Sequence, residues 1–192
     1  MRPGRALLRS GACPGDLLWV SGTLGDARLG LALLERPRGV EARRLRRHPR
    51  LARAALERQR RPTARLELGA ALVGLASACI DLSDGLVQDG GHLAKASGVA
   101  LHLAIEALPS SPALMAAYPD PARRAQQAAS GGEDYELLFT AAGSQTAQIR
   151  RLARRLGLRL TRIGEVRRGR GLRLGPGVRE VTGFDHLVAS AR

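Results

Sequence analysis

The chain of 192 residues is long enough for one large domain or two small ones, and with only 3% aromatic residues its core must consist of Leu, Val and Ala. It contains no apolar run of about 18 residues, which argues against a transmembrane span, and its two cysteines, Cys13 and Cys79, lack metal-site spacing, so we expect a cytoplasmic protein with free thiols. The net charge of +14 comes from arginines spread along the chain; the lack of a supporting motif or interleaved aromatics argues against nucleic acid as a partner.

The first predicted elements are a strand, a glycine-rich loop and a helix. Residues 17–20 form an apolar strand pattern, and residues 27–35 a helical one that closes before Pro37 and Gly39. The loop between them, residues 21–26, could hold phosphate on backbone N–H groups at the start of the helix. It lacks the P-loop pattern, however, and its spacing alone favours a plain connecting loop.

The next stretch, residues 40–61, is dense in arginine. Repulsion between these charges predicts either a solvated helix face or a mobile segment, ending at Pro62. Residues 66–75 then show leucines at helical spacing, which predicts a further helix.

A buried strand is predicted for residues 76–81, followed by a helix over residues 84–97. Gly90-Gly91 interrupts the helical pattern, because each glycine disfavours a helix by about 1 kcal/mol relative to alanine, and Gly98 is the natural stop. Strict alternation over residues 99–105 indicates a half-buried strand.

The remaining pattern alternates helices and short strands. Helices are expected over residues 121–129 and from Ser144 to Gly157. Strands are expected over residues 135–139, 158–166 (broken by Gly164), 171–174 and 179–181. Together the elements predict an α+β fold, with a mixed β-sheet packed against helices.

The stretch Asp81-Leu82-Ser83-Asp84 places three oxygen-bearing side chains at the end of the predicted buried strand. Asp81 and Ser83 project from one face of an extended segment, and Asp84 could bend back toward the same point. Mg²⁺ prefers such oxygen ligands together with phosphate oxygens. The alternative is structural: Ser83 or Asp84 caps the next helix. Spacing alone does not choose between them.

Two further positions are open to a functional and a structural interpretation. Glu133 and Asp134 follow Gly131-Gly132, and an acidic turn before a strand is the simpler interpretation; a carboxylate presented to a ligand on a glycine hinge is the other. Phe184 is one of very few aromatics and could pack in the core or stack on a flat ligand ring.

Several segments, taken in order, resemble the thiamine-monophosphate kinases. They are residues 4–12 with 14–16, 21–26, 61–66, 80–86 with 91–93, 130–137 and 183–186. The resemblance covers nearly the whole chain apart from the arginine-rich residues 38–58. It implies the C-terminal domain fold of the aminoimidazole ribonucleotide synthetase-like superfamily.

The resemblance implies transfer of the γ-phosphoryl group of ATP to thiamine monophosphate, giving thiamine diphosphate. By the same resemblance, Asp81 and Asp84 would hold Mg²⁺, and Ser83 and Arg9 would contact ATP. Such roles suit phosphoryl transfer, which depends mainly on positioning and charge neutralisation. No covalent nucleophile on the protein is needed.

Glu133 and Phe184 would, by resemblance, contact the thiamine substrate. Family members are about two domains long, and this chain resembles the second. We therefore expect residues 1–16 to be the remnant of an inter-domain connector and residues 17–192 to form the C-terminal substrate- and phosphate-binding domain. The family's N-terminal ATP-binding domain, with a GDD-type metal site and most of the homodimer interface, is expected to be missing.

Three other functions are compatible with the sequence. The chain could be a non-catalytic module that binds thiamine phosphate, or another kinase or synthetase of the same superfamily. It could also be a nucleic-acid binder built on the arginines between Arg43 and Arg65. As an incomplete kinase, it should bind Mg²⁺ only weakly by itself.

Overall fold

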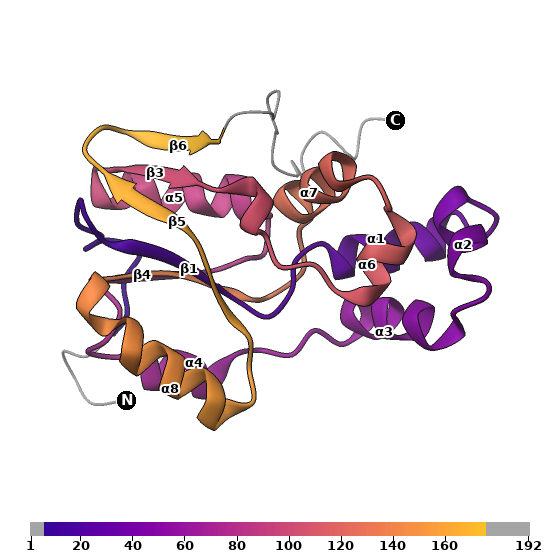
Figure 1. The fold of residues 1–192 in the computed structure, drawn as a ribbon, viewed down its shortest axis with the longest axis horizontal. Helices are drawn as coiled ribbons and strands as arrows, with labels where there is room; N and C mark the ends of the chain where they lie inside the picture. The colour runs from indigo at the N-terminus through magenta and orange to yellow at the C-terminus, as the bar shows by residue number, and fades with distance from the viewer. Residues whose placement is uncertain (1–5, 176–192) are drawn as a thin grey trace.

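A computed structural model describes residues 6–175. In this range the chain forms a sheet of six strands in the order β2-β4-β1-β5-β3-β6, with helices around it (Figure 1). The strands are β1 (Leu17–Ser21), β2 (Ala78–Asp81), β3 (Ala100–Leu103), β4 (Leu137–Ala141), β5 (Leu160–Arg167) and β6 (Gly171–Leu174). All neighbouring pairs are antiparallel except β3 and β6. The predicted α+β fold with a mixed sheet is confirmed.

Eight α-helices and two short 3₁₀ helices lie within the described residues. The α-helices are α1 (Asp26–Glu35), α2 (Val40–Leu45), α3 (Pro49–Arg60), α4 (Leu66–Leu72), α5 (Leu86–Ser97), α6 (Pro112–Ala117), α7 (Pro121–Ser130) and α8 (Thr146–Leu156). The 3₁₀ helices are Ile105–Ala107 and Gly143–Gln145. None of the helices in residues 6–175 is long and apolar enough to cross a membrane.

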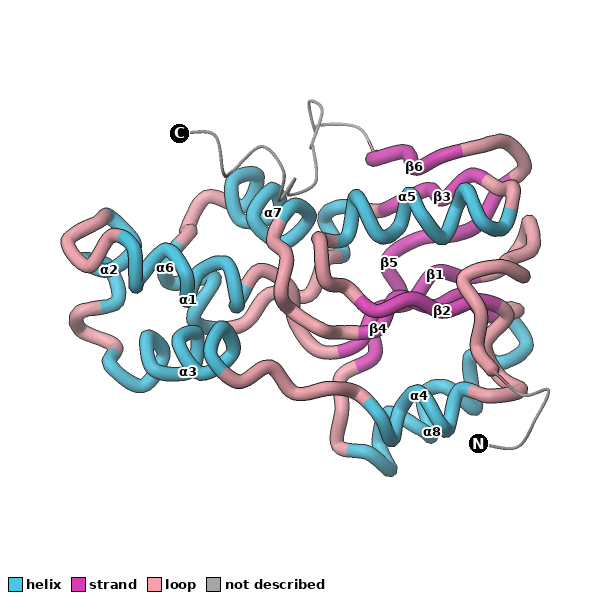
Figure 2. Tube along the Cα trace, turned by 180° about the vertical axis from the view of Figure 1, so that it is seen from behind, coloured by secondary structure: helices cyan, strands magenta, loops and turns pink. Residues whose placement is uncertain are grey.

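The two faces of the sheet carry separate hydrophobic clusters, because successive side chains of a strand point to opposite faces. On β1, Leu18 and Val20 join the larger cluster, which α5 covers. Trp19 points the other way and stacks on Phe139 of β4, with ring centroids 6.4 Å apart. Helices α4 and α8 cover this second face (Figure 2).

The arginine-dense segment folds as α2 and α3, with most of its arginines exposed, as expected for a solvated helix face. Together with α1 and α6 these helices form a group beside one end of the sheet (Figure 1). Helices α1 and α3 pack closely at Gly30, where a Cβ would overlap the carbonyl oxygen of Ala55. A glycine at this position therefore lets α3 approach α1.

Several boundaries differ from the sequence predictions. Gly90-Gly91 does not interrupt α5: a Cβ at Gly90 would come within 2.7 Å of Leu172 Cδ1, so the glycine lets β6 pack close to the helix. Gly164 does not break β5; it lies where β3 approaches, and a Cβ there would overlap the His102 carbonyl oxygen. The sequence analysis also did not predict helix α6. The strand predicted for residues 179–181 lies outside the described residues.

Candidate functional site

The two motifs that the sequence singled out lie side by side. Backbone N–H groups of Glu133 and Tyr135 donate to the carbonyl oxygens of Ser83 and Leu82, at 2.8 and 2.9 Å, and Leu82 N donates to Glu136 O at 2.8 Å. This pairing continues the ladder between β2 and β4 past the end of β2. It places Glu133 directly beside Ser83, although 50 residues separate them in the chain.

The backbone of residues 132–135, where the two motifs pair, has an unusual conformation. Glu133 and Tyr135 have φ values of 68° and 50°, in the left-handed region that non-glycine residues rarely adopt. A Cβ at Gly132 would lie 2.7 Å from the Ser83 carbonyl oxygen, so only glycine permits the approach there. Such strain is concentrated at functional sites and persists only where the surrounding structure imposes it.

A cavity of about 600 Å³ opens beside the end of β2. Its charged and polar lining comes from Arg9, Arg65, Asp81 and Tyr135, and its apolar lining from α4, from the strands β2 and β4 and from the N-terminal segment. The segment carrying Arg9 is held along the sheet edge by a hydrogen bond from Cys79 N to Leu8 O, at 2.8 Å. Two cations and a carboxylate therefore face one cavity that also has an apolar wall.

Negative charge gathers around Tyr135. The Glu133 carboxylate raises the pKa of the Tyr135 phenol, and burial, a hydrogen bond with Glu133 and the more distant charges of Asp81 and Asp84 add to this increase. The three carboxylates predicted as metal and substrate ligands thus act on the same group. Among residues 6–175, however, no set of three or more His, Cys, Asp or Glu side chains is placed to hold a metal ion.

The helix-cap interpretation of the first motif is wrong. Helix α5 starts with Gly85 at its N-cap, and neither Ser83 nor Asp84 caps it through its side chain. Asp89, one turn into the helix, instead accepts hydrogen bonds from the N–H groups of Asp84 (2.9 Å) and Gly85 (3.1 Å). The Asp84 carboxylate contacts the Gln88 side chain at 3.3 Å. The motif's side chains are therefore not used to start the helix.

Glu136 has a role that the sequence analysis missed. Its side chain is fully buried and forms ion pairs with Arg58 of α3, at 2.8 Å, and Arg65, at 2.5 Å. Ser21 Oγ donates to Glu136 Oε2 at 2.5 Å, and a Cβ at Gly22 would overlap the carboxylate. The hydrogen bond with Glu136 raises the pKa of Arg65. This network fixes Arg65, which lines the cavity.

Backbone N–H groups at the end of the glycine-rich loop, residues 21–26, donate hydrogen bonds to a carboxylate of the chain itself. Asp134 is buried and accepts hydrogen bonds from Gly25 N at 2.6 Å and Ala27 N at 3.2 Å. Gly22 N and Leu24 N donate to carbonyl oxygens elsewhere in the fold. These N–H groups are occupied, which favours the connecting-loop interpretation over a phosphate cradle. Asp134 anchors the start of α1.

We predict that Asp134 makes stability depend on pH. Burial raises the pKa of its carboxyl to about 7, and the bonds from Gly25 and Ala27 offset this only in part. The unfolded value is about 3.9. Between these values the folded chain keeps a proton that the unfolded chain loses, so the free energy of unfolding should fall by up to about 1.4 kcal/mol per pH unit. Urea unfolding at a series of pH values measures this slope.

The matched control is Asp120, an exposed carboxylate that caps α7 by accepting from Arg123 N. Asp134→Asn should flatten the slope between about pH 4 and 7, because the titrating group is gone. Asp120→Asn should leave the slope as it is. Equal slopes in the wild type and Asp134→Asn would refute the assignment.

The fold and the cavity define a domain in which loops bring arginines and carboxylates together at a sheet edge. Residues 13–175 match the family model described as AIR synthase related protein, C-terminal domain. Because the match spans most of the chain, the chain belongs to this family. This establishes the class of domain and its fold.

Comparison with individual proteins shows which members of this family the chain is similar to. The chain is 43% identical over 163 residues to the thiamine-monophosphate kinase of Salmonella typhimurium, which is 85% of this chain and 48% of that protein. The thiamine-monophosphate kinase structure from Stenotrophomonas maltophilia superimposes with a TM-score of 0.83 at 38% identity, over 93% of this chain and 55% of that one. AaThiL complexed with AMPPCP and TMP superimposes with a TM-score of 0.78 at 35% identity, over 94% and 54%. The resemblance seen in the motifs is confirmed, and the chain spans about half the length of these relatives.

Proposed function

We propose that this chain is the C-terminal part of a thiamine-monophosphate kinase, which uses ATP to phosphorylate thiamine monophosphate to thiamine diphosphate. One observation carries the proposal: Arg9, Arg65 and Asp81 line a single cavity next to the paired Ser83 and Glu133. Phosphoryl transfer needs cations for phosphate and carboxylates for a metal at one place. Similarity to AaThiL, complexed with AMPPCP and TMP, supports the same reaction.

In this proposal the guanidinium group of Arg9 contacts a phosphate of ATP, which its planar donors suit, and the Ser83 hydroxyl contacts the same nucleotide. Glu133 contacts the thiamine substrate. Its place beside Ser83 supports this, because the two ligands of a transfer reaction must meet. Phe184, the other expected substrate contact, lies outside the described residues.

Asp81 and Asp84 are proposed to hold Mg²⁺ between them and the phosphates. Asp81 is exposed at the end of β2, and both carboxylates contribute to the negative charge at Tyr135. Oxygen ligands of this kind suit Mg²⁺, which commonly keeps one or two carboxylates, phosphate oxygens and water. When bound, the ion would neutralise charge on the transferring phosphoryl group. Two carboxylates make an incomplete site, so further ligands would come from outside residues 6–175.

The proposed kinase includes a second domain besides this chain. The relatives are about twice as long as this chain, and the cavity lies beside β2, the outermost strand of the sheet. We propose that a further domain completes the ATP and metal site, and that the complete kinase is a homodimer. A cytoplasmic location, which the free thiols of Cys13 and Cys79 favour, belongs to the same proposal.

Calorimetric titration of the chain with thiamine monophosphate, in the presence of Mg²⁺ and a non-hydrolysable ATP analogue, tests the binding half of this proposal. We expect weak, saturable binding. Glu133→Gln should weaken it by about tenfold, which corresponds to the loss of one charge-assisted contact.

The control for this titration is Glu67→Gln, which changes an exposed carboxylate on α4. It should bind thiamine monophosphate like the wild type. Equal affinity of the wild type and Glu133→Gln would remove Glu133 from the proposed substrate site.

A further inference from the structure

A second cavity, separate from the candidate site, lies among α1, α2 and α3. Its volume is about 740 Å³. The floor is apolar and includes Leu33, Leu45, Ala52 and Leu56. The rim carries four arginines, Arg38, Arg43, Arg46 and Arg53. We call this cavity the arginine groove; it shares no lining residue with the cavity beside β2.

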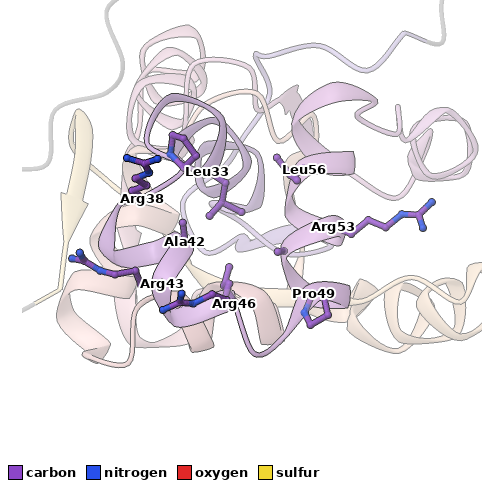
Figure 3. Close-up of a pocket in the computed structure, with 11 residues that line it drawn as sticks. Leu33, Arg38, Ala42, Arg43, Arg46, Pro49, Arg53 and Leu56 are labelled. Atoms are coloured by element: carbon purple, nitrogen blue, oxygen red, sulfur yellow. The ribbon is translucent and has the colours of Figure 1, made fainter.

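The rim arginines come from both sides of the groove. Figure 3 shows Arg38, Arg43 and Arg46 on one side and Arg53 on the opposite side, with Leu33 between them; the Arg43 and Arg53 side chains extend outward, away from the middle of the groove. All four arginines are exposed. Their guanidinium groups are therefore in contact with solvent on the two sides of the groove, where they are available to a partner that lies across α2 and α3.

The positive charge of the rim is not neutralised within the described residues, where no ion pair of the four arginines occurs. Neighbouring arginines differ: Arg44 donates to the Ala117 carbonyl oxygen at 2.8 Å, and Arg58 pairs with Glu136. Glu41, on α2, is buried and faces Arg123 of α7 at 3.7 Å. Contacts within the fold therefore explain the neighbouring charged residues, but they do not explain the four arginines of the rim.

We propose that the arginine groove binds an acidic amphipathic helix of a partner protein. The apolar side chains of the helix would cover the floor, and its carboxylates would meet the rim guanidinium groups, as amphipathic helices do in other apolar grooves. Charge complementarity argues against a second copy of this chain, whose net charge is also +14. The aliphatic floor argues against nucleic acid, because it offers no aromatic ring on which a base could stack.

The test measures binding of a fluorescent peptide to the full chain by polarisation. The probe is a helical peptide of about 20 residues, since shorter helices are marginal in water, with leucines along one face and glutamates elsewhere. A second peptide has the same composition but leucines spread around the helix. We expect the first to bind at least about tenfold more tightly, because only its leucines can reach the floor together.

Paired charge reversals locate the binding surface. Arg43→Glu with Arg46→Glu should weaken binding of the amphipathic peptide by about tenfold or more, because like charges then face each other. Arg38→Glu with Arg53→Glu, on the two sides of the groove, should do the same. Arg151→Glu with Arg155→Glu makes the same change in net charge on the exposed face of α8 and should keep wild-type affinity.

Circular dichroism of each variant confirms that it is folded. The proposal is overturned by equal binding of the two peptides, by equal losses in the groove and α8 variants, or by absence of binding at low salt. It is also overturned by a single-stranded oligonucleotide of matching charge that binds as tightly as the amphipathic peptide. Each of these outcomes leaves the proposed kinase function unaffected, since the groove shares no residue with that site.

Discussion

Replacing Glu136 by glutamine is expected to lower the free energy of unfolding by about 3–5 kcal/mol, the cost of removing one partner from a buried ion pair. Glu136 is fully buried between Arg58 and Arg65, and Ser21 donates to it as well. Glutamine keeps the shape of the side chain but loses the charge that both guanidinium groups need. Urea unfolding at neutral pH measures the change.

The control for this prediction is Glu165→Gln. Glu165 also pairs with two arginines, Arg162 and Arg167, but the pairs lie on the exposed surface of β5. Solvent screens such pairs, so no measurable change in stability is expected. A loss of stability in Glu136→Gln no larger than that in Glu165→Gln would show that the buried network is not what holds α3 and the cavity wall to the sheet.

The second large effect is expected on catalysis. We predict that Asp81→Asn lowers kcat by about 100-fold or more, since removing a group that stabilises transition-state charge commonly costs about 10²–10³ in rate. The assay uses this chain fused behind the half of the Salmonella typhimurium kinase that it does not match. Formation of thiamine diphosphate from ATP and thiamine monophosphate is measured. Stability should change little, because Asp81 is exposed.

Glu106→Gln is the matched control in the same fusion. Glu106 is an exposed carboxylate in the 3₁₀ helix after β3 and does not line the cavity. It should leave kcat unchanged. Equal activity of the Asp81→Asn and Glu106→Gln fusions would remove Asp81 from the proposed metal site.

Local patterns predicted those elements whose stability depends on one apolar face. The alternation before Ile105 marked β3, and the leucine stripe of α8 marked a helix that ends at Gly157. Helix α6 was missed, although its signal was present: Ser111 accepts from Leu114 N at 3.0 Å, and Pro112 starts the helix. A helix of six residues is too short to show periodicity, so its cap is the only sign of it.

Long-range packing explains the two errors at glycines. Gly90 and Gly164 were taken as breaks, yet each lies inside a regular element where another strand approaches. Close approach by a distant segment leaves no trace in the local pattern, so a glycine required by packing resembles a glycine that ends an element.

The candidate site was predicted in part. The motifs around Asp81 and Glu133 were identified, but their pairing depends on the alignment of β2 with β4, which no local pattern reveals. Glu136 was assigned only to a strand. The signal that could have identified it is a carboxylate in an otherwise apolar strand, because a buried charge needs a partner. Its partners lie more than 70 residues away.

Catalysis by the fusion, compared with the chain alone, tests the central claim most directly. If this chain provides the substrate and phosphate half of a thiamine-monophosphate kinase, the fusion should form thiamine diphosphate from ATP and thiamine monophosphate, and the chain alone should form none under the same conditions. A folded fusion that binds ATP but forms no thiamine diphosphate would contradict the proposed function. Equal activity of the chain alone would contradict the claim that its site is incomplete.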